Sequence, residues 1–135
     1  MQTQKLEGAM KAKVLERYFD ALRNQDWECL GECLATDVHR NGPYLDVVRG
    51  RDAYVEFLAG VIPTLPNYEL RVHSVRELED GAVMALLSEI LDVQGVRTEF
   101  PEALIFGFDP DDRIATVDIY LKQIAKGGSQ SADRR

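Results

Sequence analysis

The sequence predicts an α+β domain in which three N-terminal helices pack on the concave face of a curved, cone-shaped sheet of mixed or antiparallel strands. Three observations lead to this expectation. The chain has 135 residues, of which 45% are hydrophobic, and this is the size and composition of one globular domain. Over 8–25, 26–35 and 51–62, apolar residues recur every three or four positions, which is a helical period. From Tyr68 onwards they recur every second position, as in strands.

The expected helices occupy the first half of the chain. The segment 8–25 has apolar residues on one helical face. Asp26 is a suitable N-cap for a short second helix over 26–35, because its side chain can accept a hydrogen bond from a free backbone N–H. Gly50 leads into a third amphipathic helix over 51–62, and prolines end it.

Strands account for most of the remaining sequence. The first is expected over 37–50, interrupted by a turn at Asn41-Gly42-Pro43. The other strands are expected over 68–78, 82–93, 97–109 and 113–124, joined by short hairpin loops. Pro101 lies inside one of them, which predicts an edge position or a bulge, since proline lacks a backbone N–H. We expect one domain over 8–125, with flexible termini at 1–7 and 126–135.

Composition and charge exclude several classes of protein. A formal net charge of −7 argues against a nucleic-acid partner, which requires clustered lysines and arginines. No apolar run approaches the roughly 20 residues of a membrane span, so we expect a cytoplasmic protein without a membrane partner. Cys29 and Cys33 are expected to be buried hydrophobic residues, because two thiols do not make a zinc site. Neither a metal-ligand motif nor a nucleotide-binding loop is present, so we expect no metal and no cofactor.

The expected architecture has two consequences for binding. A sheet that bends into a cone leaves a mouth, and a pocket for a hydrophobic small molecule is the default hypothesis for such a cavity. The opposite face of the sheet remains partly apolar, which favours a homodimer formed through that face.

A family resemblance supports this layout. The runs VLERYFDALRNQDWECLGECLATDV, RGRDAYVEFL and DDRIATVDIYL resemble the nuclear transport factor 2-like superfamily over residues 10–124. This superfamily includes ketosteroid isomerases, SnoaL-type polyketide cyclases, limonene epoxide hydrolase and scytalone dehydratase. The resemblance implies the fold but not the chemistry, because the fold carries many reactions and also non-catalytic binders.

The known catalytic positions of the superfamily are mostly occupied by other residue types. Ketosteroid isomerases have an oxyanion-hole tyrosine in an Arg-Tyr pair of the first helix, which matches Arg17-Tyr18. Their catalytic base falls on Gly42 and their second oxyanion-hole group on Leu104. The Asp-Arg-Asp set of limonene epoxide hydrolase is also not retained in form. The usual catalytic aspartates are therefore absent.

The same alignment implies which side chains point into the cone. It turns Leu87, Glu89 and Leu91 inward from one strand and Phe100, Glu102 and Leu104 from the next. A two-residue loop at Gly95-Val96 would pair Glu89 directly with Glu102, with Cβ atoms roughly 5 Å apart. Two such carboxylates in an apolar wall repel, so one keeps its proton to higher pH, as general acid–base catalysis requires. A register slip of one residue would instead turn both outward.

The candidate catalytic residues are therefore Tyr18, which would polarise a substrate oxygen, and Glu89 and Glu102, which would move protons. Arg40 is either an anchor for a substrate carboxylate or phosphate, or an exposed edge arginine. His73 is either a ligand contact or a half-buried structural histidine. The candidate substrate-binding residues are Arg40, Asn41, His73, Leu87, Phe100, Leu104, Val117 and Leu121.

Two functions follow from this set. The favoured one is a cofactor-independent enzyme that transfers protons on a hydrophobic small molecule, in an isomerisation, dehydration or cyclisation. The alternative is a non-catalytic module for ligand binding or dimerisation.

Overall fold

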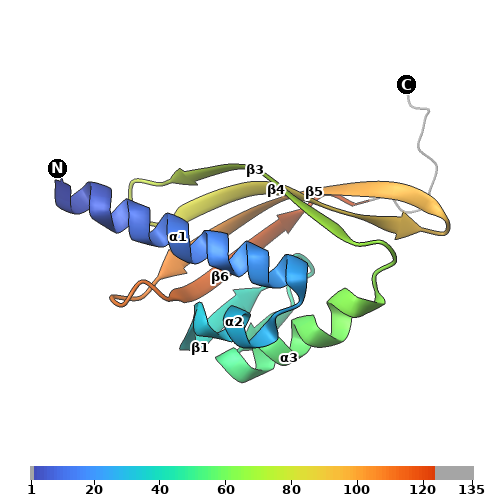
Figure 1. The fold of residues 1–135 in the computed structure, drawn as a ribbon, viewed down its shortest axis with the longest axis horizontal. Coiled ribbons are helices and arrows are strands. Elements are labelled where there is room, and N and C mark those ends of the chain that lie inside the picture. Colours follow the sequence, from blue (N-terminus) through green and yellow to red (C-terminus); the bar gives the residue numbers. More distant parts are fainter. Residues whose placement is uncertain (1, 124–135) are drawn as a thin grey trace.

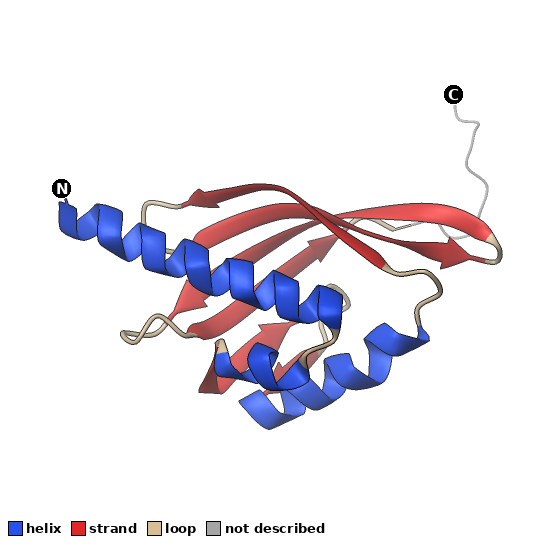
Figure 2. Cartoon of the chain, viewed as in Figure 1, coloured by secondary structure: helices blue, strands red, loops and turns tan. Residues whose placement is uncertain are grey.

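In the computed structural model, which describes residues 2–123, three helices lie on one face of a six-stranded sheet (Figure 1). The helices are α1 (Gln2–Asn24), α2 (Trp27–Glu32) and α3 (Arg51–Val61), and a 3-10 turn, η1 (Ile62–Thr64), follows α3. The strands are β1 (Leu34–Asn41), β2 (Val47–Arg49), β3 (Glu69–Glu77), β4 (Val83–Val93), β5 (Val96–Phe108) and β6 (Ile114–Leu121). Figure 2 shows that the helices gather on one side of the curved sheet. The expected α+β class is confirmed.

The sheet is mixed and open. Its strand order is β2-β1-β6-β5-β4-β3, so β2 and β3 are the free edges. The β1 and β6 strands are parallel, and the other neighbours are antiparallel. None of the helices in residues 2–123 is both long and apolar enough to cross a membrane.

The core lies between the helices and the concave face of the sheet. In α1, Leu15, Tyr18, Phe19 and Leu22 are all at most 6% exposed, which confirms the predicted helical face. The rings of Tyr18 and Phe19 meet Phe106 of β5 edge-on, with centroids 5.6 and 5.9 Å away. These contacts seat α1 on the sheet.

Element ends differ from the expectation in two places. The second helix stops at Glu32, because the next residues pair with β6: Ile114 donates its N–H to the Cys33 carbonyl at 2.8 Å, and Leu34 lies opposite Ile114. The first helix begins at Gln2, although residues 1–7 were expected to be a flexible terminus. The other expected flexible terminus, 126–135, lies outside the described residues.

Pro101 occupies an interior strand, so the predicted edge position or bulge is wrong. It lies in β5, between β4 and β6, and is paired with Ser88 without a register shift. Its carbonyl accepts a hydrogen bond from the Lys122 N–H at 3.0 Å, so its backbone polar side faces β6. Because β6 ends at Leu121, the missing N–H of Pro101 falls where the neighbouring strand has already ended.

The β4–β5 hairpin fixes the register on which the site depends. Its turn is Gln94-Gly95, with φ angles of 51° and 80°, and Val93 pairs with Val96. Two residues with positive φ form the kind of tight turn that matches the twist of a hairpin. The expected loop at Gly95-Val96 is therefore wrong, because Val96 is already paired with Val93 as the first residue of β5.

Candidate active site

The register places the two glutamates diagonally on the concave face. Glu89 of β4 lies opposite Phe100, and Glu102 of β5 lies opposite Leu87. The expected direct opposition of Glu89 and Glu102 is therefore wrong by two residues. A shift of two residues keeps each side chain on the same face of the sheet, so both glutamates still share a face with the buried Leu87. Long side chains on diagonal positions remain within reach of one another.

The two carboxyl groups form a hydrogen-bonded pair. Burial, followed by the hydrogen bond to Glu89 and the charge of Glu89, raises the pKa of Glu102 to about 10. A carboxyl group donates a hydrogen bond only when it carries a proton, so Glu102, whose pKa is raised, is the donor and Glu89 is the acceptor. Both side chains are half-buried rather than sealed in the core. The pair thus presents one proton donor and one proton acceptor side by side.

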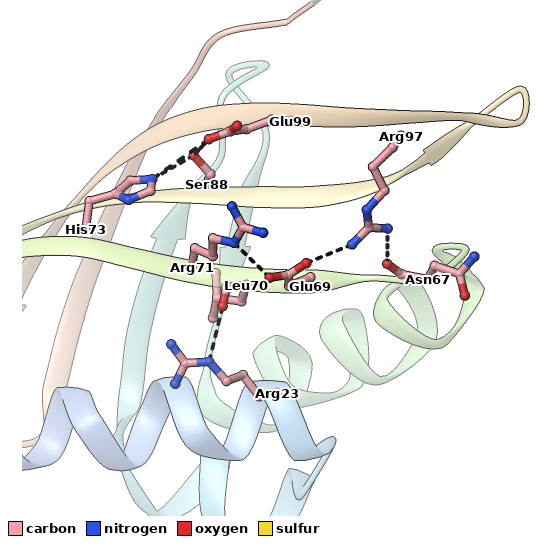
Figure 3. Close-up of polar contacts among 9 residues, drawn as sticks. All are labelled: Arg23, Asn67, Glu69, Leu70, Arg71, His73, Ser88, Arg97 and Glu99. Carbon is pink, nitrogen blue, oxygen red and sulfur yellow. Dashed lines mark hydrogen bonds and ion pairs between the residues drawn. The ribbon is translucent and has the colours of Figure 1, made fainter.

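Tyr68 holds the carboxylate of this pair. Its hydroxyl donates a hydrogen bond to Glu89 Oε2 at 2.6 Å. Burial and the nearby charge of Glu89 raise the pKa of the Tyr68 hydroxyl far above its ordinary range, so it remains a donor. The neighbouring Glu69 accepts hydrogen bonds from Arg71 at 2.8 Å and Arg97 at 2.9 Å (Figure 3). These contacts link the start of β3 to β5 and so fix the backbone beside Tyr68.

A second pair of hydroxyl groups lies deeper in the fold. Tyr18 of α1 and Tyr54 of α3 are 3% and 0% exposed, and their hydroxyl oxygens are 2.6 Å apart. Burial raises the pKa of Tyr18 well above its ordinary value and that of Tyr54 to about 12. The bond between the two hydroxyls uses one of their two protons, so the other proton is free to polarise a ligand oxygen.

Arg40 lies on the concave side, and the alternative of an exposed edge arginine is not observed. It is two residues from the buried Val38 on β1 and lies opposite Val117 of β6, so it shares their face. Its side chain is 12% exposed. The guanidinium carbon stands 4.6 Å from the ring centre of Phe57 on α3.

The remaining candidate substrate-binding residues lie partly in the interior and partly on the outer face of the sheet. Leu87, Leu104 and Val117 are at most 6% exposed in the core, while Phe100 and Leu121 are half-buried on the concave side. Asn41 instead donates from Nδ2 to Asp118 Oδ1 at 2.7 Å, on the face of β1 opposite to that of Arg40. The structure does not bring Asn41 to the carboxyl pair.

His73 also lies away from the carboxyl pair. Its Nε2 is 2.9 Å from Ser88 Oγ, and this hydroxyl donates to Glu99 Oε2 at 2.6 Å (Figure 3). Ser88 alternates with Glu89 along β4, so its side chain projects from the opposite face of the sheet. The His73 side chain is 50% exposed, and its polar contact is with Ser88 rather than with the carboxyl pair. A register shift in β3 between Val72 and Ser74 brings it to this position.

Comparison with known proteins supports the family. Residues 15–117 match the family model of the SnoaL-like domain, so this chain belongs to the SnoaL-like family. Bal32a, from a soil-derived mobile gene cassette, is 17% identical with a TM-score of 0.75, and the alignment covers 87% of this chain and 92% of that chain. The resemblance to the nuclear transport factor 2-like superfamily is confirmed without pointing to a specific member. A comparison with curated proteins finds no match.

Two further structural neighbours have catalytic descriptions. An epoxide hydrolase from M. tuberculosis, similar to limonene epoxide hydrolase, is 20% identical with a TM-score of 0.71, and the alignment covers 84% of each chain. SalBIII, an epoxide hydrolase/cyclase-like enzyme in pyran ring formation in the polyether salinomycin, is 17% identical with a TM-score of 0.74. That alignment covers 91% of this chain and 95% of SalBIII. At these identities the likeness shows the fold alone.

Proposed function

We propose that this protein is a cofactor-independent enzyme that transfers protons on a hydrophobic small molecule bound against the concave face of the sheet. The observation that carries this proposal is the Glu89–Glu102 pair, in which burial raises the pKa of Glu102 above neutrality and Glu89 accepts its hydrogen bond. General acid–base catalysis requires such a pair, with both groups in their working protonation state at neutral pH.

The proposed reaction balances without an oxidant or a reductant. Glu89 takes a proton from a substrate carbon or hydroxyl, and Glu102 gives its proton to a substrate oxygen. In an isomerisation the substrate gains one proton and loses one, and in a dehydration the protonated oxygen leaves as water while a C=C bond forms. The hydrogen bond between the carboxyl groups then returns the proton from Glu89 to Glu102. Opening of an epoxide by an internal hydroxyl needs the same donor and acceptor.

Three tyrosines complete the proposed site. Tyr68 keeps Glu89 oriented through its 2.6 Å hydrogen bond. The spare proton of the Tyr18–Tyr54 pair would stabilise negative charge that develops on a substrate oxygen. In this assignment Tyr18 keeps the role expected from the sequence, but it acts together with a partner hydroxyl.

The test measures proton transfer directly. We would incubate the protein with a panel of hydrophobic ketones in D₂O and follow deuterium incorporation beside the carbonyl by NMR. Glu89→Gln and Glu102→Gln are each expected to lose about 100-fold or more of the exchange rate. The control is Glu99→Gln, which changes a glutamate on the opposite face of the sheet and should retain the rate.

The alternative function predicts a different result in the same assay. A non-catalytic binding module would bind members of the panel, seen as a rise in melting temperature, without accelerating exchange for any of them. Full exchange in Glu89→Gln and Glu102→Gln would also overturn the proposed roles.

The outer face of the sheet supports a proposed homodimer. Leu86 and Tyr120 are 40% and 61% exposed there, beside a groove of about 410 Å³ that Pro101 and Ala103 also line. Such a patch fits a second copy of the same chain. A Leu86→Glu variant should sediment as a monomer, whereas an unchanged sedimentation coefficient would contradict the proposal. A cytoplasmic location stays a prediction.

A further inference from the structure

Arg40 has more hydrogen-bond donors than the surrounding protein satisfies. A guanidinium group carries five N–H donors and is always charged. Among the described residues, its only hydrogen bond runs from NH1 to Asp46 Oδ2 at 3.5 Å, which is long for a charged pair. The Arg40 side chain is nevertheless only 12% exposed. Such a buried charge normally requires closer partners.

The carboxyl pair does not supply those partners. Within residues 2–123, no oxygen of Glu89 or Glu102 lies within 4.0 Å of the Arg40 guanidinium, since its one ion pair is with Asp46. Arg40 and both glutamates nevertheless lie on the same concave face of the sheet. The positive charge of Arg40 opposes the effect of burial, which raises the pKa values of Tyr18, Tyr54 and Glu102. The guanidinium and the carboxyl pair thus share this face without forming an ion pair.

The ring of Phe57 orients the guanidinium. The guanidinium carbon stands 4.6 Å from the ring centre, a distance at which the flat group is attracted to an aromatic ring. Phe57 accepts no conventional hydrogen bond, so this contact leaves the N–H groups of the guanidinium available to a ligand. Tyr54 lies three residues before Phe57 on the same side of α3, so Arg40 is held next to the buried hydroxyl pair.

We infer that Arg40 binds a carboxylate group of the substrate, and that the substrate is therefore a hydrophobic carboxylic acid whose reacting atoms lie toward Glu89 and Glu102. This inference rests on the proposed function, because it places the substrate between Arg40 and the carboxyl pair. A planar carboxylate can accept two parallel N–H bonds from the planar guanidinium, and it replaces the long contact to Asp46.

Charge selects a carboxylate over a phosphate. At neutral pH Glu102 is protonated, so it adds no negative charge to the face on which Arg40 lies. Arg40 carries one positive charge, which matches a bound monoanion once its contact with Asp46 is released. A phosphate monoester adds about two charges beside Glu89 and is more strongly repelled.

Asp46 competes with the substrate in this arrangement. Its side chain is 42% exposed and follows the β1–β2 turn, where its Oδ1 accepts a hydrogen bond from the Tyr44 N–H at 3.1 Å. An asparagine at this position can still accept that bond but no longer pairs with Arg40 as an anion. The Asp46→Asn substitution should therefore leave the turn in place and make Arg40 more available to a ligand.

The experiment compares two probes that differ only in charge. Dissociation constants for naphthylacetate and naphthylacetamide are measured by calorimetry at pH 7 and low salt. The wild-type protein should bind the carboxylate at least about tenfold more tightly than the amide. Arg40→Gln should abolish this preference and Asp46→Asn should increase it. Arg49→Gln, which removes the same charge from an exposed residue of β2, should leave it unchanged.

The outcomes separate this inference from the proposed function. No preference for naphthylacetate in the wild type, or a preference that survives in a folded Arg40→Gln variant, overturns the inference. If Arg40→Gln does not fold, a decreased or unchanged preference in Asp46→Asn overturns it instead. A carboxylate preference without deuterium exchange on any ketone, keto acids included, refutes the proton-transfer proposal alone. Exchange that is equally fast for neutral ketones and for keto acids refutes the carboxylate inference alone.

Discussion

Replacing Glu102 with glutamine should change how the stability of the protein depends on pH. Burial raises the pKa of this carboxyl group from 4.5 to about 10 in the folded state. Between these two values the folded state holds a proton that the unfolded state has lost. The free energy of unfolding therefore falls as pH rises through this window, by up to about 1.4 kcal/mol per pH unit. Glutamine does not titrate, and its amide can still donate to Glu89.

The size of the effect follows from the width of the window. From pH 5 to pH 8 the wild type should lose up to about 4 kcal/mol relative to Glu102→Gln. Because the side chain is half-buried and partly reached by water, we expect a relative loss of about 2–4 kcal/mol. The two proteins should have similar stability at pH 5, where Glu102 is protonated when folded. At pH 8 the variant should be the more stable protein.

Guanidinium denaturation at pH 5, 6.5 and 8 measures this difference, provided that the slope of the free energy with denaturant stays constant. The matched control is Glu79→Gln, which changes an exposed glutamate outside the regular strands. Its stability should follow the wild-type pH dependence. Parallel curves for the wild type and Glu102→Gln from pH 5 to pH 8 would mean that Glu102 ionises in the ordinary range, and the proposed acid would not exist.

Four further substitutions test the tyrosine contacts and the β4–β5 turn. Tyr68→Phe removes a donor to the Glu89 carboxylate and should lower the free energy of unfolding at pH 7 by about 1.5–3 kcal/mol; no loss would mean that water replaces the hydroxyl. Tyr54→Phe leaves the buried Tyr18 hydroxyl without its hydrogen-bond partner and should lower the free energy of unfolding by about 1–3 kcal/mol. The double variant with Tyr18→Phe should lower it by less than the sum of the two single changes. Gly95→Ala, at φ 80°, should lower thermal stability by about 1 kcal/mol, and an unchanged melting temperature would contradict the turn conformation.

The hydrophobic spacing was sufficient to predict the helices and most strands, because burial on one side imposes a period that remains visible in the sequence. The inward faces followed from the family resemblance. The spacing did not predict where pairing with a distant strand turns a segment with a helical pattern into a strand. Leu34 and Ala35 continue the helical pattern of α2 in the sequence, yet their contact with β6 makes them part of a strand. That contact joins segments about 80 residues apart, and no local pattern encodes it.

The sequence of the β4–β5 turn indicates its position, but the predicted loop at Gly95-Val96 lies one residue after the observed turn at Gln94-Gly95. Val96 is β-branched and unsuited to positive φ, whereas a polar residue followed by glycine fits both positions of the turn at Gln94-Gly95. The role of Tyr68 was beyond sequence reasoning for a different reason. Its contact with Glu89 depends on the register between β3 and β4, where Leu70 lies opposite Glu89, and a residue just before a strand gives no sign of that alignment.

The charge balance of the concave face links the acid to the arginine. With Glu102 protonated, this carboxyl group adds no negative charge to the concave face, on which the positive charge of Arg40 also lies. Ionisation of Glu102 would add an uncompensated negative charge to a half-buried region, and a bound carboxylate would oppose that ionisation further. Because such coupling is reciprocal, the proton on Glu102 also favours an anionic ligand at Arg40. The same charges therefore keep Glu102 protonated and favour a carboxylate ligand at Arg40.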